Sequence, residues 1–244
     1  ENSGEQVSVI EEGSGGLTQL YWSNGVRLSK DFAVGLKTSY IFSSIVNMYK
    51  NTLAESSQAV RYVAAIEEKS YVKDFSFSAG FSYSKDSLFN QKRYRLSIGA
   101  VYNFQADLNT TKTDKLVRTT TAGDTIESVI LPSSARGSID IPAGITAGIS
   151  LSRDNRWTIG TEFSFQDWTT FRSVNSDDEE GLGKSWRIAL GGEVTPNGFD
   201  ESYFKRVTYR LGASMEQTPF LENNKPVKDV GINFGFSLPA GRSS

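Results

Sequence analysis

The stretch that decides the fold is Trp157-Thr158-Ile159-Gly160-Thr161-Glu162-Phe163-Ser164-Phe165. Large side chains, mostly apolar, stand at every second position, and small or polar residues stand between them. Because successive side chains of a strand point to opposite faces, this pattern predicts a strand with one apolar and one polar face. The same two-residue period returns about nine times along the chain, at residues 20–28, 32–42, 75–83, 94–104, 141–151, 157–165, 186–194, 207–215 and 230–238.

The connections between these segments alternate in length. Short ones fall near residues 30, 88, 154, 200 and 240, and longer ones near 58, 122, 176 and 222. In an up-and-down barrel every second connection lies on the same rim, and outer-membrane barrels have short periplasmic turns and long extracellular loops. We therefore expect one transmembrane β-barrel domain over residues 1–244, with an N-terminal approach segment at 1–16 and long loops near 46–70, 106–139, 169–184 and 217–227.

The composition narrows the function classes. The 244 residues carry a formal net charge of -2, which gives no basic surface for nucleic acid. Cysteine and histidine are both absent, so thiolate sites, disulfides and the commonest general base are excluded. The acidic run Asp177–Glu180 lacks the spaced ligands and the glycine of a calcium loop, so we interpret it as a solvated loop tip. We expect no enzyme active site, no metal and no cofactor.

Alternation alone does not say which face meets water. A soluble lipocalin-like barrel or sandwich would place the apolar face inside, whereas a membrane barrel turns it towards lipid. The glycines favour the membrane barrel, because a solvent-exposed strand face would carry threonine, lysine and glutamate, and glycine weakens strands. The polar face instead holds the glycines expected in a crowded interior: Gly35, Gly80, Gly99, Gly144, Gly148, Gly160, Gly191, Gly212, Gly231 and Gly235.

Large aromatic residues gather near the ends of the expected strands. Aromatic girdles at both membrane interfaces are typical of outer-membrane barrels. One girdle is expected to contain Phe32, Tyr83 and Trp157 at the short-turn rim, and the other to contain Phe42, Phe104, Trp168 and Trp186.

Charged residues also fall on the face that the membrane barrel would turn inwards. They could guide or gate a solute, or they could form pairs that brace the barrel interior, and the second interpretation is favoured because charges in a lumen must be paired or hydrated. The expected lumen-facing polar residues are Lys37, Asp74, Arg95, Glu162, Arg187, Glu193, Arg210 and Glu216.

One stretch resembles a known family. Residues 15–35 combine a strand, the tight turn Lys30-Asp31 and a second strand that begins Phe32-Ala33-Val34-Gly35, and residues 153–160 and 196–212 are similar. This pattern resembles the long-chain fatty-acid transporter (FadL-like) family of bacterial outer-membrane barrels. The resemblance implies a fourteen-stranded barrel with an N-terminal plug that moves hydrophobic molecules inward. Since single-chain bacterial barrels have even strand numbers, about nine strands predict that the chain is part of a larger barrel.

The leading functional hypothesis is an outer-membrane barrel of a Gram-negative bacterium that transports hydrophobic compounds such as fatty acids. The alternative is a structural barrel subunit of an outer-membrane secretion or protein-assembly complex. The expected partners are membrane lipid and lipopolysaccharide, hydrophobic small molecules, and other outer-membrane proteins in a complex.

Overall fold

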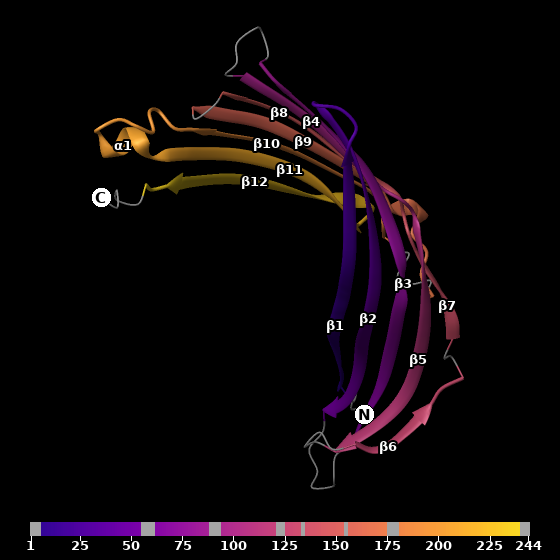
Figure 1. Cartoon of the computed structure of the whole chain (residues 1–244). Coiled ribbons are helices and arrows are strands. Elements are labelled where there is room, and N and C mark those ends of the chain that lie inside the picture. Colours follow the sequence, from indigo (N-terminus) through magenta and orange to yellow (C-terminus); the bar gives the residue numbers. More distant parts are fainter. Residues whose placement is uncertain are drawn as a thin grey trace, which may run out of the picture.

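The computed structural model describes residues 6–54, 62–87, 94–120, 125–132, 135–153, 156–174 and 181–239. They form one antiparallel sheet of 12 strands, strongly curved and open at both edges (Figure 1). No helix within these ranges is long and apolar enough to cross a membrane. The strands are β1 (Gln6–Arg27), β2 (Phe32–Ala54), β3 (Tyr62–Asp86), β4 (Tyr94–Asn103), β5 (Ala106–Thr120), β6 (Thr125–Ile130), β7 (Ala135–Ile141), β8 (Gly144–Arg153), β9 (Trp157–Asp167), β10 (Lys184–Val194), β11 (Thr208–Glu222) and β12 (Lys225–Ser237).

The strand order shows how nine expected strands become 12. The main path is β1-β2-β3-β4-β8-β9-β10-β11-β12. Strand β3 pairs with β4 through residues 78–86 and with β5 through residues 62–72, so β4 and β5 are two parts of one long bent strand. On the other side of this bent strand, β6 and β7 pair with β5, and β8 pairs with β4. Strands β6, β7 and β8 therefore form a second long bent strand. The prediction of an antiparallel up-and-down barrel wall is confirmed.

The register separates two faces across the whole sheet. One continuous row of paired residues is entirely apolar: Val26, Val34, Phe81, Ala100, Ala147, Phe163, Ile188, Met215 and Val230. The adjacent row points to the opposite face and is mostly small or polar: Arg27, Ala33, Ser82, Gly99, Gly148, Glu162, Ala189, Ser214 and Gly231.

The apolar face is an exposed belt. Phe81 is 42%, Ile188 46% and Val230 68% exposed. On β3 the outward positions of this belt run from Phe75 to Tyr83 and end at Lys73 and Lys85. That length matches the 9–11 residues of a tilted membrane strand, so this belt faces lipid and the opposite face lines the interior.

Three regions that the sequence analysis assigned to the approach segment and to loops are instead strands. Strand β1 begins at Gln6, within the expected approach segment 1–16. Strands β2 and β3 cover most of 46–70, and β5, β6 and β7 occupy most of 106–139. These segments lie beyond the lipid belt, where no apolar face is required, so backbone pairing forms strands that strict alternation does not reveal.

The expected loop at 217–227 is a tight hairpin. Strands β11 and β12 continue to Asn223 and Asn224, whose φ angles of 51° and 61° lie in the left-handed region. Two positive φ angles are the requirement of a two-residue type I′ turn, and asparagine tolerates them. Conversely, the connection near residue 200 is long: it spans 195–207 and contains helix α1 (Tyr203–Arg206). The 169–184 connection contains a 3-10 turn, η2 (Trp168–Thr170), and the acidic run at 177–180 lies outside the described residues.

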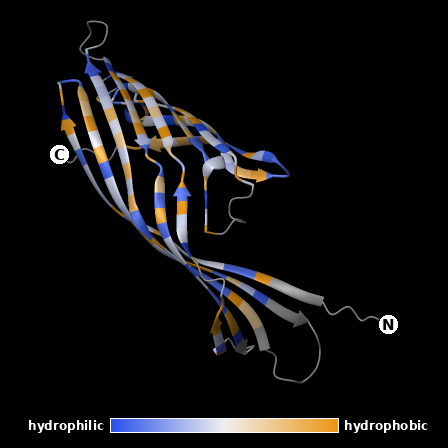
Figure 2. Cartoon of the chain, turned by 90° about the vertical axis from the view of Figure 1, so that its right-hand side faces the viewer, coloured by the Kyte–Doolittle hydropathy of each residue, from blue (hydrophilic) through white to orange (hydrophobic). Residues whose placement is uncertain are grey.

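Parts of six strands lie far past the lipid belt on one side of the sheet. We call this part the extension; it comprises residues 6–16 of β1, 44–54 of β2, 62–73 of β3, and all of β5, β6 and β7. At roughly 3.3 Å per residue, the β3 portion alone rises about 40 Å. The extension projects away from strands β8–β12 (Figure 1), and its hydropathy is mixed rather than banded (Figure 2).

The extension is held by its own small core and by ion pairs. Val72, Ala106 and Leu108 are buried and pack with Ile41, Ile139 and Ile141 at its base. Further out, the Lys112 ammonium lies 3.3 Å from Glu68 and 3.5 Å from Asp114, where little of any of the three side chains is exposed. The Lys50 ammonium lies 2.7 Å from Glu12. The extension is therefore stabilised by its own side-chain contacts as well as by backbone pairing.

A substitution at Gly80 tests how closely β3 and β4 approach each other. A Cβ at Gly80 would lie 2.9 Å from the Ala100 carbonyl oxygen, whereas a Cβ at Gly16 meets nothing within 4 Å. Gly80→Ala should destabilise the protein by about 1–3 kcal/mol, because the ladder between β3 and β4 must shift. Gly16→Ala, also in a strand, is the control. Urea unfolding in lipid vesicles measures both, and equal midpoints would contradict the close approach.

Candidate functional site: the polar face of the curved sheet

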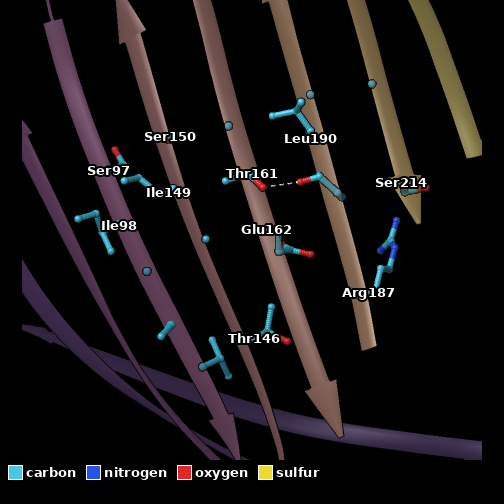
Figure 3. A pocket seen from close by; sticks show the side chains of 18 of the residues that line it. Ser97, Ile98, Thr146, Ile149, Ser150, Thr161, Glu162, Arg187, Leu190 and Ser214 are labelled. Atoms are coloured by element: carbon cyan, nitrogen blue, oxygen red, sulfur yellow. Dashed lines mark hydrogen bonds between the residues drawn. The ribbon is translucent and has the colours of Figure 1, made fainter. Parts of the chain in front are cut away.

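The polar face contains a row of residues without bulky side chains. Gly160, Gly191 and Gly212 are aligned across β9, β10 and β11. The row continues through Ser150 and Asn233 on the flanking strands. A hollow of about 660 Å³ lies along this row (Figure 3). The glycines make room for this space because a side chain at any of them would point into it.

All eight residues expected to face the lumen lie on this polar face, by register. Several are paired. The Arg210 Nε atom lies 2.9 Å from Glu193, and its Nη1 atom donates to Ser237 at 2.5 Å. Arg187 lies 3.8 Å from Glu216 across β10 and β11.

The other members of the set occupy different surroundings. Arg95 pairs with Asp86 at 2.5 Å near the end of β3. The Lys37 ammonium lies 5.5 Å from the centre of the Tyr21 ring. Glu162 borders the hollow (Figure 3), and no hydrogen bond or ion pair joins it to another of the described residues. Most of these charged side chains therefore form contacts between neighbouring strands.

Asp74 has a specific structural position. Its carboxylate accepts hydrogen bonds from the Phe75 amide at 2.7 Å, the Asn109 amide at 3.3 Å and the Asn109 side-chain amide at 2.5 Å. Asp74 lies where β3 exchanges β4 for β5 as its neighbour. The side chain thus replaces the ladder bonds that the change of partner interrupts and ties the extension to the barrel wall.

Five of the seven expected girdle residues lie on the apolar face by register, namely Phe32, Phe42, Tyr83, Trp157 and Trp186. Phe104 follows β4 directly, and Trp168 lies in η2. Phe32 and Tyr83 are paired in register, and Tyr94 packs against Trp157 with ring centroids 6.2 Å apart. Towards the other end of the lipid-facing belt, Trp186 is paired with Phe165. Phe104 packs against Tyr102 at 5.1 Å, Phe42 against Tyr40 at 5.9 Å, and Trp168 against Phe171 at 5.8 Å.

Outside the membrane-spanning segments, hydrogen bonds shift a few pKa values. The Ser202 amide, followed by the Lys205 side chain, lowers the pKa of the Asp200 carboxyl. The Thr169 hydroxyl lowers the pKa of Asp167 at the start of η2. In the extension, the Tyr71 hydroxyl raises the pKa of Lys69. These shifts keep each of the three groups charged near neutral pH.

The sequence analysis missed the charged and polar residues of the extension. Asn109, Lys112, Glu68 and Asp114 lie in segments that were expected to be loops. A weak signal was present, because threonine recurs through residues 110–120 and favours strands. Within the described residues, no three acidic side chains come together as a metal site would require.

A protein-family model named BamG matches residues 1–244, the whole chain. The chain belongs to the BamG family. A search of curated proteins found no match. Among solved structures, this BamG-family chain is similar to the Ralstonia pickettii toluene transporter TbuX, with a TM-score of 0.52 and 13% sequence identity over 94% of this chain and 60% of TbuX. The BamG-family chain therefore spans less than two thirds of the length of TbuX.

Two further solved structures are more distant. The CymD monoaromatic hydrocarbon channel has a TM-score of 0.41 and 12% identity, over 97% of this chain and 80% of CymD. The Pseudomonas putida toluene transporter TodX has a TM-score of 0.36 and 12% identity, over 96% and 79%. The expected resemblance to FadL-like barrels is confirmed for the fold, and the predicted location in the outer membrane of Gram-negative bacteria is confirmed as well.

Removing the Asp74 carboxylate should loosen the extension without unfolding the wall. In Asp74→Ala the Asn109 amide loses its acceptor, which costs about 1–3 kcal/mol locally. Hydrogen exchange of the amides in residues 106–120 should accelerate, while those of β9 and β10 stay protected. Glu162→Ala, which removes a carboxylate without a described partner, is the matched control. Unchanged exchange in 106–120 would show that Asp74 does not anchor the extension.

Proposed function

We propose that this BamG-family protein is a barrel subunit of an outer-membrane protein-assembly complex, in which the extension binds partner proteins. The observation that carries the proposal is the extension itself. Crossing the membrane requires about 9–11 residues per strand, yet β2 has 23 residues and β3 has 25. A paired sheet that continues for about 40 Å along β3 beyond the lipid belt supplies a large protein surface outside the lipid.

The surface of the extension suits protein contacts. All six residues of β6 are exposed, including Ile126, Val129 and Ile130. Among the described strands, β6 pairs only with β5, so its outer edge is free to accept a strand from another protein. The match to the BamG family model supports the same proposal of an assembly-related role.

Charged side chains border the hollow on the polar face. Along the hollow, the polar face carries glycine, serine and threonine, with Glu162 and Arg187 at its border, and Arg187 is paired with Glu216. An apolar molecule in the hollow would contact apolar side chains such as Ile98, Ile149 and Leu190, but it would also lie beside these charged side chains. We therefore propose binding to protein partners, lipid and lipopolysaccharide as the main interactions, and no enzymatic activity.

A second candidate function is transport of hydrophobic compounds such as fatty acids or monoaromatic hydrocarbons. It is supported by the likeness in fold to TbuX. Radiolabelled fatty-acid and toluene binding by the purified protein, together with their uptake by a depletion strain, test it. We expect neither saturable binding nor an uptake defect; finding both would favour transport over the subunit role.

The assembly proposal is tested by purification in mild detergent with an affinity tag. We expect stoichiometric outer-membrane partners to co-purify with the wild-type protein. In a shortened variant, residues 113–134 are replaced by Asn-Gly, which can close a two-residue hairpin because Lys112 and Ala135 are register partners. This variant should keep its heat-modifiable gel migration but lose the partners.

Glu162→Gln, with the extension intact, is the control and should retain the partners. A wild-type protein that purifies alone would contradict the subunit role. Partners that remain bound to the shortened variant would place their contact elsewhere on the molecule.

A further inference from the structure

The connection between β10 and β11 exposes aromatic rings at the rim opposite the extension. Phe199 is 86% exposed and Phe204 75% exposed, and Tyr203 is also exposed. The rim is the one that carries the β1–β2 and β8–β9 turns, and α1 lies at its edge (Figure 1). Exposed aromatic residues that cluster in one segment indicate an interaction surface.

Hydrogen bonds hold this connection in one conformation. The Asn197 amide donates to the Lys205 carbonyl at 2.8 Å, which closes the segment on itself. The Asp200 carboxylate accepts from the Ser202 amide at 3.0 Å and lies 3.2 Å from the Lys205 ammonium. The Thr195 amide donates to the Arg156 carbonyl at 2.7 Å, which ties the segment to the β8–β9 turn. The rings are thus presented by a fixed scaffold.

The exposed rings continue the lipid-facing belt. Tyr209 lies on the outward face of β11, paired in register with Phe236, and the two ring centroids are 5.7 Å apart. The Tyr209 hydroxyl donates to the Phe204 carbonyl at 3.0 Å, so the segment begins where the belt ends. Because this surface directly adjoins the end of the lipid-facing belt, it lies at the level of the lipid headgroups.

The charges of the segment agree with this position. Lys205 and Arg206 follow the aromatic residues directly, and the Arg206 guanidinium lies 5.6 Å from the centre of the Tyr203 ring. Aromatic rings beside lysine and arginine are typical of the membrane interface, where the rings enter the headgroup layer and the cations face lipid phosphates.

We propose that residues Phe199–Arg206 form an interfacial membrane anchor on the turn rim. Phe199 and Phe204 insert into the adjacent leaflet at headgroup depth, with Arg206 and the Lys205–Asp200 ion pair at the same level. The anchor fixes the height and tilt of the barrel wall in the membrane, because it adds a second layer of aromatic contacts below the belt. This inference does not depend on the assembly role.

The absence of cysteine allows a direct measurement. Single variants Phe199→Cys and Phe204→Cys of the full chain are spin-labelled and reconstituted into vesicles of phosphatidylethanolamine and phosphatidylglycerol. Glu201→Cys is the matched control, since Glu201 is exposed in the same segment. Power saturation compares collisions with oxygen, which concentrates in the membrane, and with a water-soluble nickel chelate. Heat-modifiable gel migration verifies folding of each variant.

The expected result is a ratio of oxygen to nickel collisions several-fold higher at positions 199 and 204 than at 201. Ratios at 199 and 204 equal to that at 201 would show that the segment stays in water and would overturn the anchor. Exclusion of both reagents would show burial against protein, and would overturn it as well.

Discussion

The continuous antiparallel hydrogen-bond ladder is the constraint on which the rest of the structure depends. In lipid, a backbone polar group without a partner costs several kcal/mol, so each membrane-crossing strand must be paired along its length. Between the two open edges of the sheet, the register from Val26 on β1 to Val230 on β12 meets this requirement. Once that register is set, the apolar residues of the belt lie on one face of the sheet, and the row Gly160, Gly191 and Gly212 lies on the other.

The same ladder explains the extension. Hydrogen bonding between strands does not end where the lipid ends, so β1, β2 and β3 continue as a sheet in water. There the side chains are free to be polar, and ion pairs such as Lys112 with Glu68 replace the apolar belt. Asp74 and Asn109 stabilise the place where the strand made of β4 and β5 bends out of the wall. The proposed binding role of the extension thus rests on the backbone pairing that builds the membrane wall.

The two rims of the molecule differ in kind. One rim carries a tall sheet with a free edge at β6, which is suited to protein partners. The other carries turns and the structured connection at 195–207, whose exposed rings suit a lipid surface. An arrangement with protein contacts on one side and lipid contacts on the other would hold the barrel at a defined depth while it binds partners.

The sequence by itself determined the wall. Strict alternation in segments such as 157–165 identified the strands and their two faces, because a lipid belt imposes a period of two on side-chain hydropathy. The glycines on the polar face then indicated that the apolar face meets lipid. Only the tertiary structure decided that residues 106–120 form a strand, that Asn223-Asn224 is a tight turn and that Asp74 reaches Asn109. The physical reason is that outside lipid a strand is specified by its neighbour's backbone, over separations of tens of residues, and backbone pairing leaves little trace in side-chain pattern.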